Sequence, residues 1–189
     1  MHELLIGGQK SGKSAQAERL AQRWLADDST NQVVFIVTAQ GFDDEMQARI
    51  ARHQSDRALR FEKNLERTFT IEEPLNIALR IQAHSNAKTL IVLDCITVWL
   101  VNYLMPFAPL SNLTTPYETA QTGLLQALKR AHGPIVVVSN EIGLGVIPTG
   151  QAVRAYVDAL GLLNQTLAQA CQRVTLMSAG LPLSLKGAP

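Results

Sequence analysis

Residues 7–14 have the types and the spacing of a phosphate-binding loop. They match the pattern G-x-x-x-x-G-K-[ST]. Glycines let the backbone curl so that successive N–H groups point at one anion, and a following helix adds the positive end of its dipole. Lys13 would reach the β- and γ-phosphates, and Ser14 would hold Mg²⁺. We therefore expect a nucleoside triphosphate, ATP or GTP, to bind through these residues: Gly7, Gly8, Gln9, Lys10, Ser11, Gly12, Lys13 and Ser14.

The segments that flank this loop are those that such a site requires. Residues 4–6 form a short apolar run, and residues 13–27 carry apolar side chains at helical spacing. A chance glycine-rich turn before a helix is the alternative. The strand before the loop and the helix after it favour phosphate binding.

The remaining apolar runs predict an α/β fold. Runs at 33–37, 90–93, 135–139 and 174–177 lack alternation, as expected for strands covered on both faces, and 183–185 could add an edge strand. Because helical patterns separate them, we predict a P-loop NTPase of the RecA-like type, with a mostly parallel sheet and helices on both faces. The three prolines in 105–116 indicate that this segment is a loop. Residues 55–70 have no clear helical or strand periodicity. A single nucleotide-binding domain over 1–189 is the simplest organisation.

Composition excludes several classes of protein. The chain has 189 residues, 47% of them hydrophobic and 17% charged, with a net charge of +1. This balance gives no reason to expect nucleic acid as a partner.

No stretch is long and apolar enough for a membrane span, and the loop 7–14 begins too early to leave room for a signal peptide. Cys95 and Cys171 lack metal-ligand spacing and are expected to be buried small apolar residues in a reducing compartment. We expect a cytoplasmic protein.

Polar residues follow several predicted strands, at the edge of the sheet where ligands of open α/β folds bind. Thr38-Ala39-Gln40 follows the second strand, Asp94 the third, and Asn140 and Glu141 the fourth. Asp94 could be a helix cap, but beside a phosphate-binding loop it is better interpreted as a Mg²⁺ ligand opposite Ser14. Glu141 could orient a water, a metal or a substrate hydroxyl, or simply be a loop carboxylate.

A basic row on a predicted helix is the second candidate for chemistry. Acidic residues begin the segment 43–57 and basic residues end it, which matches a helix dipole. Arg49, His53 and Arg57 follow one another at intervals of four and would form one row. The arginines would offer donors to phosphate oxygens, and His53 would be a nucleophile between them. Physics alone favours a solvated basic face.

The chain resembles a known family over nearly its whole length, the bifunctional adenosylcobinamide kinase / adenosylcobinamide-phosphate guanylyltransferase of cobalamin biosynthesis. The resemblance rests on blocks at 7–14, 38–40, 43–46, 49–53, 94–97, 139–145, 164–165 and 179–182. The most specific part of the resemblance is the combination of two blocks, Asp-Asp-Glu-Met…His and Asn-Glu-x-Gly-x-Gly.

The resemblance implies two reactions. A nucleoside triphosphate phosphorylates the aminopropanol hydroxyl of adenosylcobinamide. A histidine, which corresponds to His53, then attacks the α-phosphate of GTP, and the resulting guanylyl group passes to adenosylcobinamide phosphate to give adenosylcobinamide-GDP. Family members are homotrimers. Nucleotide contacts are implied for the first loop, Thr38, Ala39, Gln40 and Asp94, and Arg49, Arg57 and Glu72 complete the expected nucleotide site.

The sequence also departs from the family pattern. Val157 replaces a usual arginine, Gly150 replaces a frequent asparagine, and the segment between His53 and Glu72 is longer than usual.

Two other functions stay open at this point. One is a small-molecule kinase or RecA-like ATPase that uses no covalent histidine. The other is a GTP switch, for which the guanine-binding motif Asn-Lys-x-Asp is missing.

Overall fold

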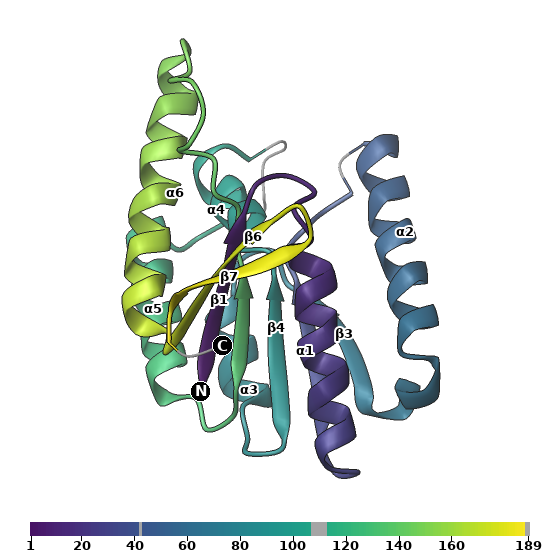
Figure 1. Ribbon diagram of the computed structural model, residues 1–189. Coiled ribbons are helices and arrows are strands. Elements are labelled where there is room, and N and C mark those ends of the chain that lie inside the picture. Colours follow the sequence, from purple (N-terminus) through teal and green to yellow (C-terminus); the bar gives the residue numbers. More distant parts are fainter. Residues whose placement is uncertain (42, 107–112, 188–189) are drawn as a thin grey trace.

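A computed structural model describes residues 1–41, 43–106 and 113–187 of the chain. Strands and helices alternate along most of it (Figure 1). The strands are β1 (His2–Gly7), β2 (Gln32–Val37), β3 (Thr68–Glu72), β4 (Thr89–Asp94), β5 (Ile135–Val138), β6 (Arg173–Ser178) and β7 (Leu181–Lys186). The helices are α1 (Lys13–Asp27), α2 (Asp44–Arg60), α3 (Ile77–His84), α4 (Ile96–Leu104), α5 (Tyr117–Arg130) and α6 (Gln151–Ala170), with a 3₁₀ helix η1 (Glu62–Arg67).

Within this described part, the strands form one seven-stranded sheet in the order β3-β2-β4-β5-β1-β6-β7. All neighbouring strands are parallel except β6 and β7, which form an antiparallel hairpin. The carboxyl ends of β1, β4 and β5 therefore meet at one edge, where the loop 7–14 begins. The predicted mostly parallel sheet is confirmed.

Alternate side chains of the buried strands feed two separate cores, one on each face of the sheet. Leu4 and Ile6 pack in a core with α3, α4, α5 and α6, whereas Leu5 packs in a second core with α1. Both faces are thus covered, which explains why these strands are apolar without alternation. The expected helices on both faces are confirmed.

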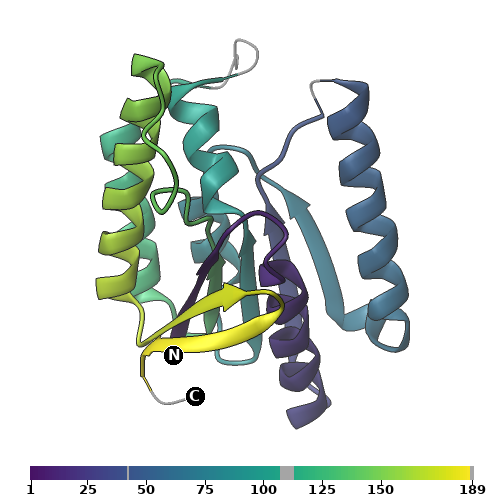
Figure 2. The same cartoon turned by 45° about the horizontal axis from the view of Figure 1, so that its top comes forward.

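The helix α2 is stabilised by local signals at its two ends. The Asp43 carboxylate accepts a hydrogen bond from the Met46 backbone N–H at 2.7 Å, and acidic residues occupy the first turn. Arg57 and Arg60 lie in the last turn, where they complement the helix dipole. α2 stands on the β3 side of the molecule, on the opposite flank from α6, in both ribbon views (Figure 1, Figure 2).

The structure adds an element within the segment 55–70, which the sequence left without assignment. α2 continues through Arg60, η1 follows, and β3 begins at Thr68 and pairs with β2. β3 is a partly exposed edge strand, so it lacks the continuous apolar run of the central strands. β7 is likewise exposed and extends beyond the expected 183–185. The loop expected over 105–116 falls largely on 107–112, outside the described residues. None of the helices in the described ranges is long and apolar enough to cross a membrane.

Candidate functional site

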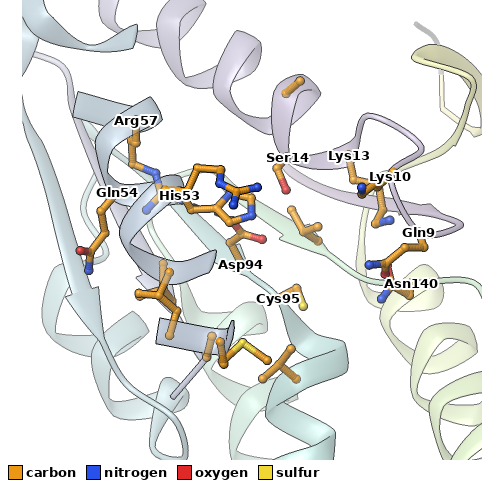
Figure 3. A pocket seen from close by; sticks show the side chains of 18 of the residues that line it. Gln9, Lys10, Lys13, Ser14, His53, Gln54, Arg57, Asp94, Cys95 and Asn140 are labelled. Carbon is orange, nitrogen blue, oxygen red and sulfur yellow. Dashed lines mark hydrogen bonds and ion pairs between the residues drawn. The ribbon is translucent and has the colours of Figure 1, made fainter. Parts of the chain in front are cut away.

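A cavity of about 840 Å³ lies at the carboxyl edge of the sheet. The loop 7–14 and the start of α1 bound it on one side, α2 bounds it on the other, and the ends of β4 and β5 form its floor. In Figure 3, Lys13 and Ser14 approach from the loop, His53 and Arg57 approach from α2, and Asp94 lies between them. The two segments with predicted chemistry thus face one space.

The backbone of the loop 7–14 requires glycine at two positions. Gly7 has φ +155° and a Cβ there would lie 2.3 Å from the Met177 carbonyl oxygen. Gly12 has φ +99° and a Cβ would lie 3.0 Å from the Gly180 Cα. The Gly180 N–H also donates to the Ser11 carbonyl at 3.0 Å. The loop is therefore supported from behind by β6 and by the turn into β7.

Lys13 is buried within this loop. Its Nζ donates to the carbonyl oxygens of Gly7, at 3.0 Å, and Gly8, at 2.6 Å. Burial lowers the pKa of Lys13, while the nearby Cys95 and Asp94 oppose this shift. A phosphate placed in the cavity could replace these carbonyl oxygens as the partner of the ammonium group.

Asp94 already has a cationic partner. Its Oδ2 lies 3.3 Å from an Nη of Arg57, and the Arg57 guanidinium lies 4.2 Å from the centre of the Phe35 ring. The Arg57 side chain is 6% exposed, and its Nε has no hydrogen-bond partner among the described residues. Burial lowers the pKa of Arg57, but an arginine stays charged in proteins. This guanidinium is a charged donor held at the edge of the cavity.

The structure divides the predicted row of Arg49, His53 and Arg57. Both His53 and Arg57 line the cavity, but His53 is exposed whereas Arg57 is buried against the sheet. The side chain of Arg49 lies outside the described part of the structure.

The other predicted nucleotide contacts, which lie in the segment after β2 and at the end of β3, take different positions. Ala39 lines the cavity, but Thr38 is fully buried and its hydroxyl donates to the Cys95 carbonyl at 2.7 Å. Gln40 does not line the cavity, and Glu72 lines a smaller adjoining pocket of about 260 Å³. The structure therefore gives Thr38 a supporting position beneath the site.

The cavity is also lined by residues that were not among the expected nucleotide contacts, including Gln54, Cys95 and Asn140, of which Asn140 was expected at the end of a strand. Gln54 donates to Glu72 at 3.1 Å and so joins α2 to β3. The alternating, partly β-branched segment 68–72 was the signal that could have revealed this strand and its contact. Cys95 corrects the expectation of two buried apolar cysteines, because it is only partly buried.

Glu141 takes a local structural position. Its Oε1 accepts a hydrogen bond from the Gly143 N–H at 2.7 Å, and its own N–H donates to the Gly7 carbonyl at 3.0 Å. Of the two interpretations of Glu141, the structure favours the loop carboxylate.

Comparison with known proteins gives consistent similarities over the whole chain. A family described as cobinamide kinase / cobinamide phosphate guanyltransferase matches residues 3–185. A bifunctional adenosylcobalamin biosynthesis protein CobP from Pseudomonas aeruginosa is 41% identical over 189 residues, covering 100% of this chain and 99% of the relative. A bifunctional adenosylcobalamin biosynthesis protein CobU from Escherichia coli is 31% identical, covering 97% and 98%.

A solved structure is similar in fold alone. The flagellar accessory protein FlaH from Methanocaldococcus jannaschii aligns with a TM-score of 0.55 and 13% identity, covering 98% of this chain and 78% of FlaH. Together with the strand order, this similarity confirms the predicted α/β architecture with a mostly parallel sheet.

Proposed function

Since this chain belongs to the cobinamide kinase / cobinamide phosphate guanyltransferase family, we propose that it phosphorylates adenosylcobinamide and then transfers GMP from GTP to the product. The end product is adenosylcobinamide-GDP. The observation that carries this proposal is the shared cavity, which both Lys13 and His53 line. A nucleoside triphosphate held there is opened at its γ-phosphate in the first reaction, and a second triphosphate, GTP, is opened at its α-phosphate in the second.

In the kinase step, the loop 7–14 holds the phosphates and Lys13 stabilises the charge that develops as the γ-phosphoryl group leaves. The Ser14 hydroxyl and the Asp94 carboxylate both line the cavity, and oxygen donors of this kind suit Mg²⁺. No group of three or more His, Cys, Asp or Glu side chains that could hold a metal ion occurs among the described residues. Mg²⁺ would supply further charge stabilisation between the β- and γ-phosphates.

In the guanylyl step, a ring nitrogen of His53 attacks the α-phosphorus of GTP. A P–N bond forms, the bond from the α-phosphorus to the α,β-bridging oxygen breaks, and pyrophosphate leaves. A phosphate oxygen of adenosylcobinamide phosphate then attacks the same phosphorus. The P–N bond breaks, and the free histidine is restored.

We propose that α2 moves to bring His53 to the α-phosphate. In the described part of the chain, the polar side-chain contacts of α2 with α1 and the sheet come from Gln54, Arg57 and Arg60, whose partners are Glu72, Asp94 and Glu18. All three lie in the carboxyl half of α2, and His53 precedes the first of them directly. Movement of His53 toward the α-phosphate therefore requires these contacts to break or rearrange.

GTP labelled at the α-phosphate tests the covalent step. Wild-type protein should acquire acid-labile label, and His53→Ala should acquire none. His84→Ala is the matched control, because His84 ends α3 and does not line the cavity. Unlabelled wild-type protein would overturn the histidine mechanism and favour a kinase that acts without a covalent step.

We also propose that the protein works as a homotrimer, as the family resemblance implies, and that it is located in the cytoplasm, as expected from the sequence. Analytical ultracentrifugation should give three times the monomer mass of 20.7 kDa. A monomer at micromolar concentration would contradict this assembly, and recovery of the native protein in a membrane fraction would contradict the location.

A further inference from the structure

We infer that the apolar loop between β5 and α6, residues 142–147, docks the corrinoid ring of the cobinamide substrate. This inference rests on the proposed function, because it takes adenosylcobinamide as the second substrate. The segment reads Ile-Gly-Leu-Gly-Val-Ile and contains no polar side chain.

The apolar loop displays its large side chains to solvent. Leu144 is 85% exposed, Val146 is 96% exposed and Ile147 is 79% exposed. Single exposed apolar side chains are ordinary, but several within four residues form a contiguous surface of the kind that binds a ligand or a partner.

Both ends of the apolar loop are fixed to the fold. Before it, the Asn140 N–H donates to the Thr97 hydroxyl at 2.7 Å, and the Asn164 side chain donates to the Asn140 carbonyl at 3.0 Å. After it, the Arg154 guanidinium donates to the carbonyl oxygens of Pro148, at 3.0 Å, and Thr149. The apolar loop is therefore a surface held in place by polar contacts at its base.

The apolar loop also adjoins the cavity. Asn140 lines the cavity, and the chain from Asn140 to Leu144 spans at most about 14 Å. Figure 1 shows the segment rising from β5 beside α6, at the same end of the sheet as the loop 7–14. A substrate that delivers a hydroxyl group to the nucleotide can thus reach the apolar loop with its remaining part.

The size and chemistry of the corrinoid ring identify it as the group that binds the apolar loop. The cavity of about 840 Å³ must hold the nucleotide, and sites of roughly 300–1,000 Å³ enclose drug-sized ligands. A corrinoid ring with its substituents is larger than such ligands. Only its aminopropanol arm enters the cavity, and the ring stays outside. Its methyl-bearing apolar edge then needs an apolar surface, which the loop 142–147 provides.

The test replaces two exposed side chains together, Leu144→Ser with Val146→Ser. The KM for adenosylcobinamide should rise on the order of 10-fold, as expected for lost apolar contacts, while kcat stays the same. Labelling of His53 by GTP needs no corrinoid and should be unchanged, as should the mass in sedimentation. The conservative pair Leu144→Met with Val146→Ile should keep the wild-type KM.

Leu185→Ser is the matched control, because Leu185 is 55% exposed and lies on β7 toward the amino-terminal end of β6, away from the cavity. An unchanged KM in the double serine variant, with active wild-type enzyme, would overturn the inference. So would a changed oligomeric mass, which would make the apolar loop a contact between copies of the chain. Wild-type protein that fails to phosphorylate adenosylcobinamide would instead overturn the proposed function itself.

Discussion

Arg57 and Asp94, which are 37 residues apart, form an ion pair at 3.3 Å between α2 and the end of β4. The pair joins the helix that carries His53 to the strand that carries the expected metal ligand. The Phe35 ring beneath the guanidinium restricts it to one side of the cavity. Two parts of the site that the sequence treats separately are thus coupled by one contact.

Removal of Arg57 should destabilise the fold. Arg57→Ala loses a charge-assisted hydrogen bond and a cation–π contact, so we expect the free energy of unfolding in urea to fall by about 2–3 kcal/mol. The loss is smaller than for a fully buried pair because the Asp94 side chain is 20% exposed. Arg52→Ala is the control, since Arg52 is an exposed arginine on the same helix, and it should change stability by less than about 0.5 kcal/mol. Equal effects of the two substitutions would show that the pair contributes nothing.

Asp94→Asn should remove the metal-dependent part of nucleotide binding. For the wild-type protein, GTP should raise the melting temperature more with Mg²⁺ than with a chelator, because ligands of the native state stabilise it. In Asp94→Asn, GTP should raise the melting temperature equally with Mg²⁺ and with a chelator, since the amide is a weaker ligand for a hard cation. Asp28→Asn, which changes a carboxylate paired with Lys88 on the surface, should behave as wild type. A full Mg²⁺ effect in Asp94→Asn would place the metal elsewhere.

Lys13→Ala should lower the rate of phosphoryl transfer at least about 100-fold, because it removes the charge next to the γ-phosphate. The control Lys88→Ala removes an exposed lysine outside the cavity and should keep the wild-type rate. A near-normal rate in Lys13→Ala would refute the assignment of this residue.

The lowered pKa of Lys13 gives a pH dependence with a definite sign. Burial makes the ammonium lose its proton at a lower pH than an ordinary lysine, and a bound triphosphate favours the charged form. Nucleotide affinity should therefore fall as the pH rises toward the usual lysine range, with proton uptake on binding. Calorimetry in two buffers of different ionisation enthalpy measures this uptake. If Lys13→Ala binds nucleotide without this proton uptake, the proton is taken up by Lys13.

Two glycine substitutions should have opposite effects. Gly7→Ala places a methyl group 2.3 Å from the Met177 carbonyl oxygen, so we expect a loss of about 2–4 kcal/mol in unfolding free energy. Gly161 lies within α6 with open space around its Cα, and Gly161→Ala should stabilise the protein by about 0.5–1 kcal/mol. Thermal unfolding distinguishes the two. Destabilisation by Gly161→Ala as large as that by Gly7→Ala would show that steric contact is not the cause.

The parts of the fold that local sequence determines could be predicted closely. The bounds of α1 match those expected from its apolar face and from the loop before it, and the central strands follow buried apolar runs. β3 has no buried apolar run, and only the alternation within 68–72 indicates it. It is an edge strand after a charged segment, and its pairing with β2 is a tertiary contact.

The site was predictable where one segment builds it. The loop 7–14 needed only its own residues, whereas the contact of Arg57 with Asp94 depends on how α2 packs. Four residues of an α-helix turn through about 400°, so Arg57 lies about 40° further around the axis than His53. This offset is enough to bury one side chain and leave its neighbour in solvent. Periodicity places residues on a helix but does not say which direction faces the sheet.

The support of the loop 7–14 by Met177 and Gly180 has a consequence for synthesis of the protein. The loop leaves the ribosome well before residues 173–180, which include Gly180 and β6, the strand that pairs with β1. During translation the nascent chain has the phosphate-binding residues without the backbone that holds them in shape. The contacts of the loop with Met177 and Gly180 form only after residues 173–180 have emerged, so we expect shorter nascent chains to bind nucleotide weakly.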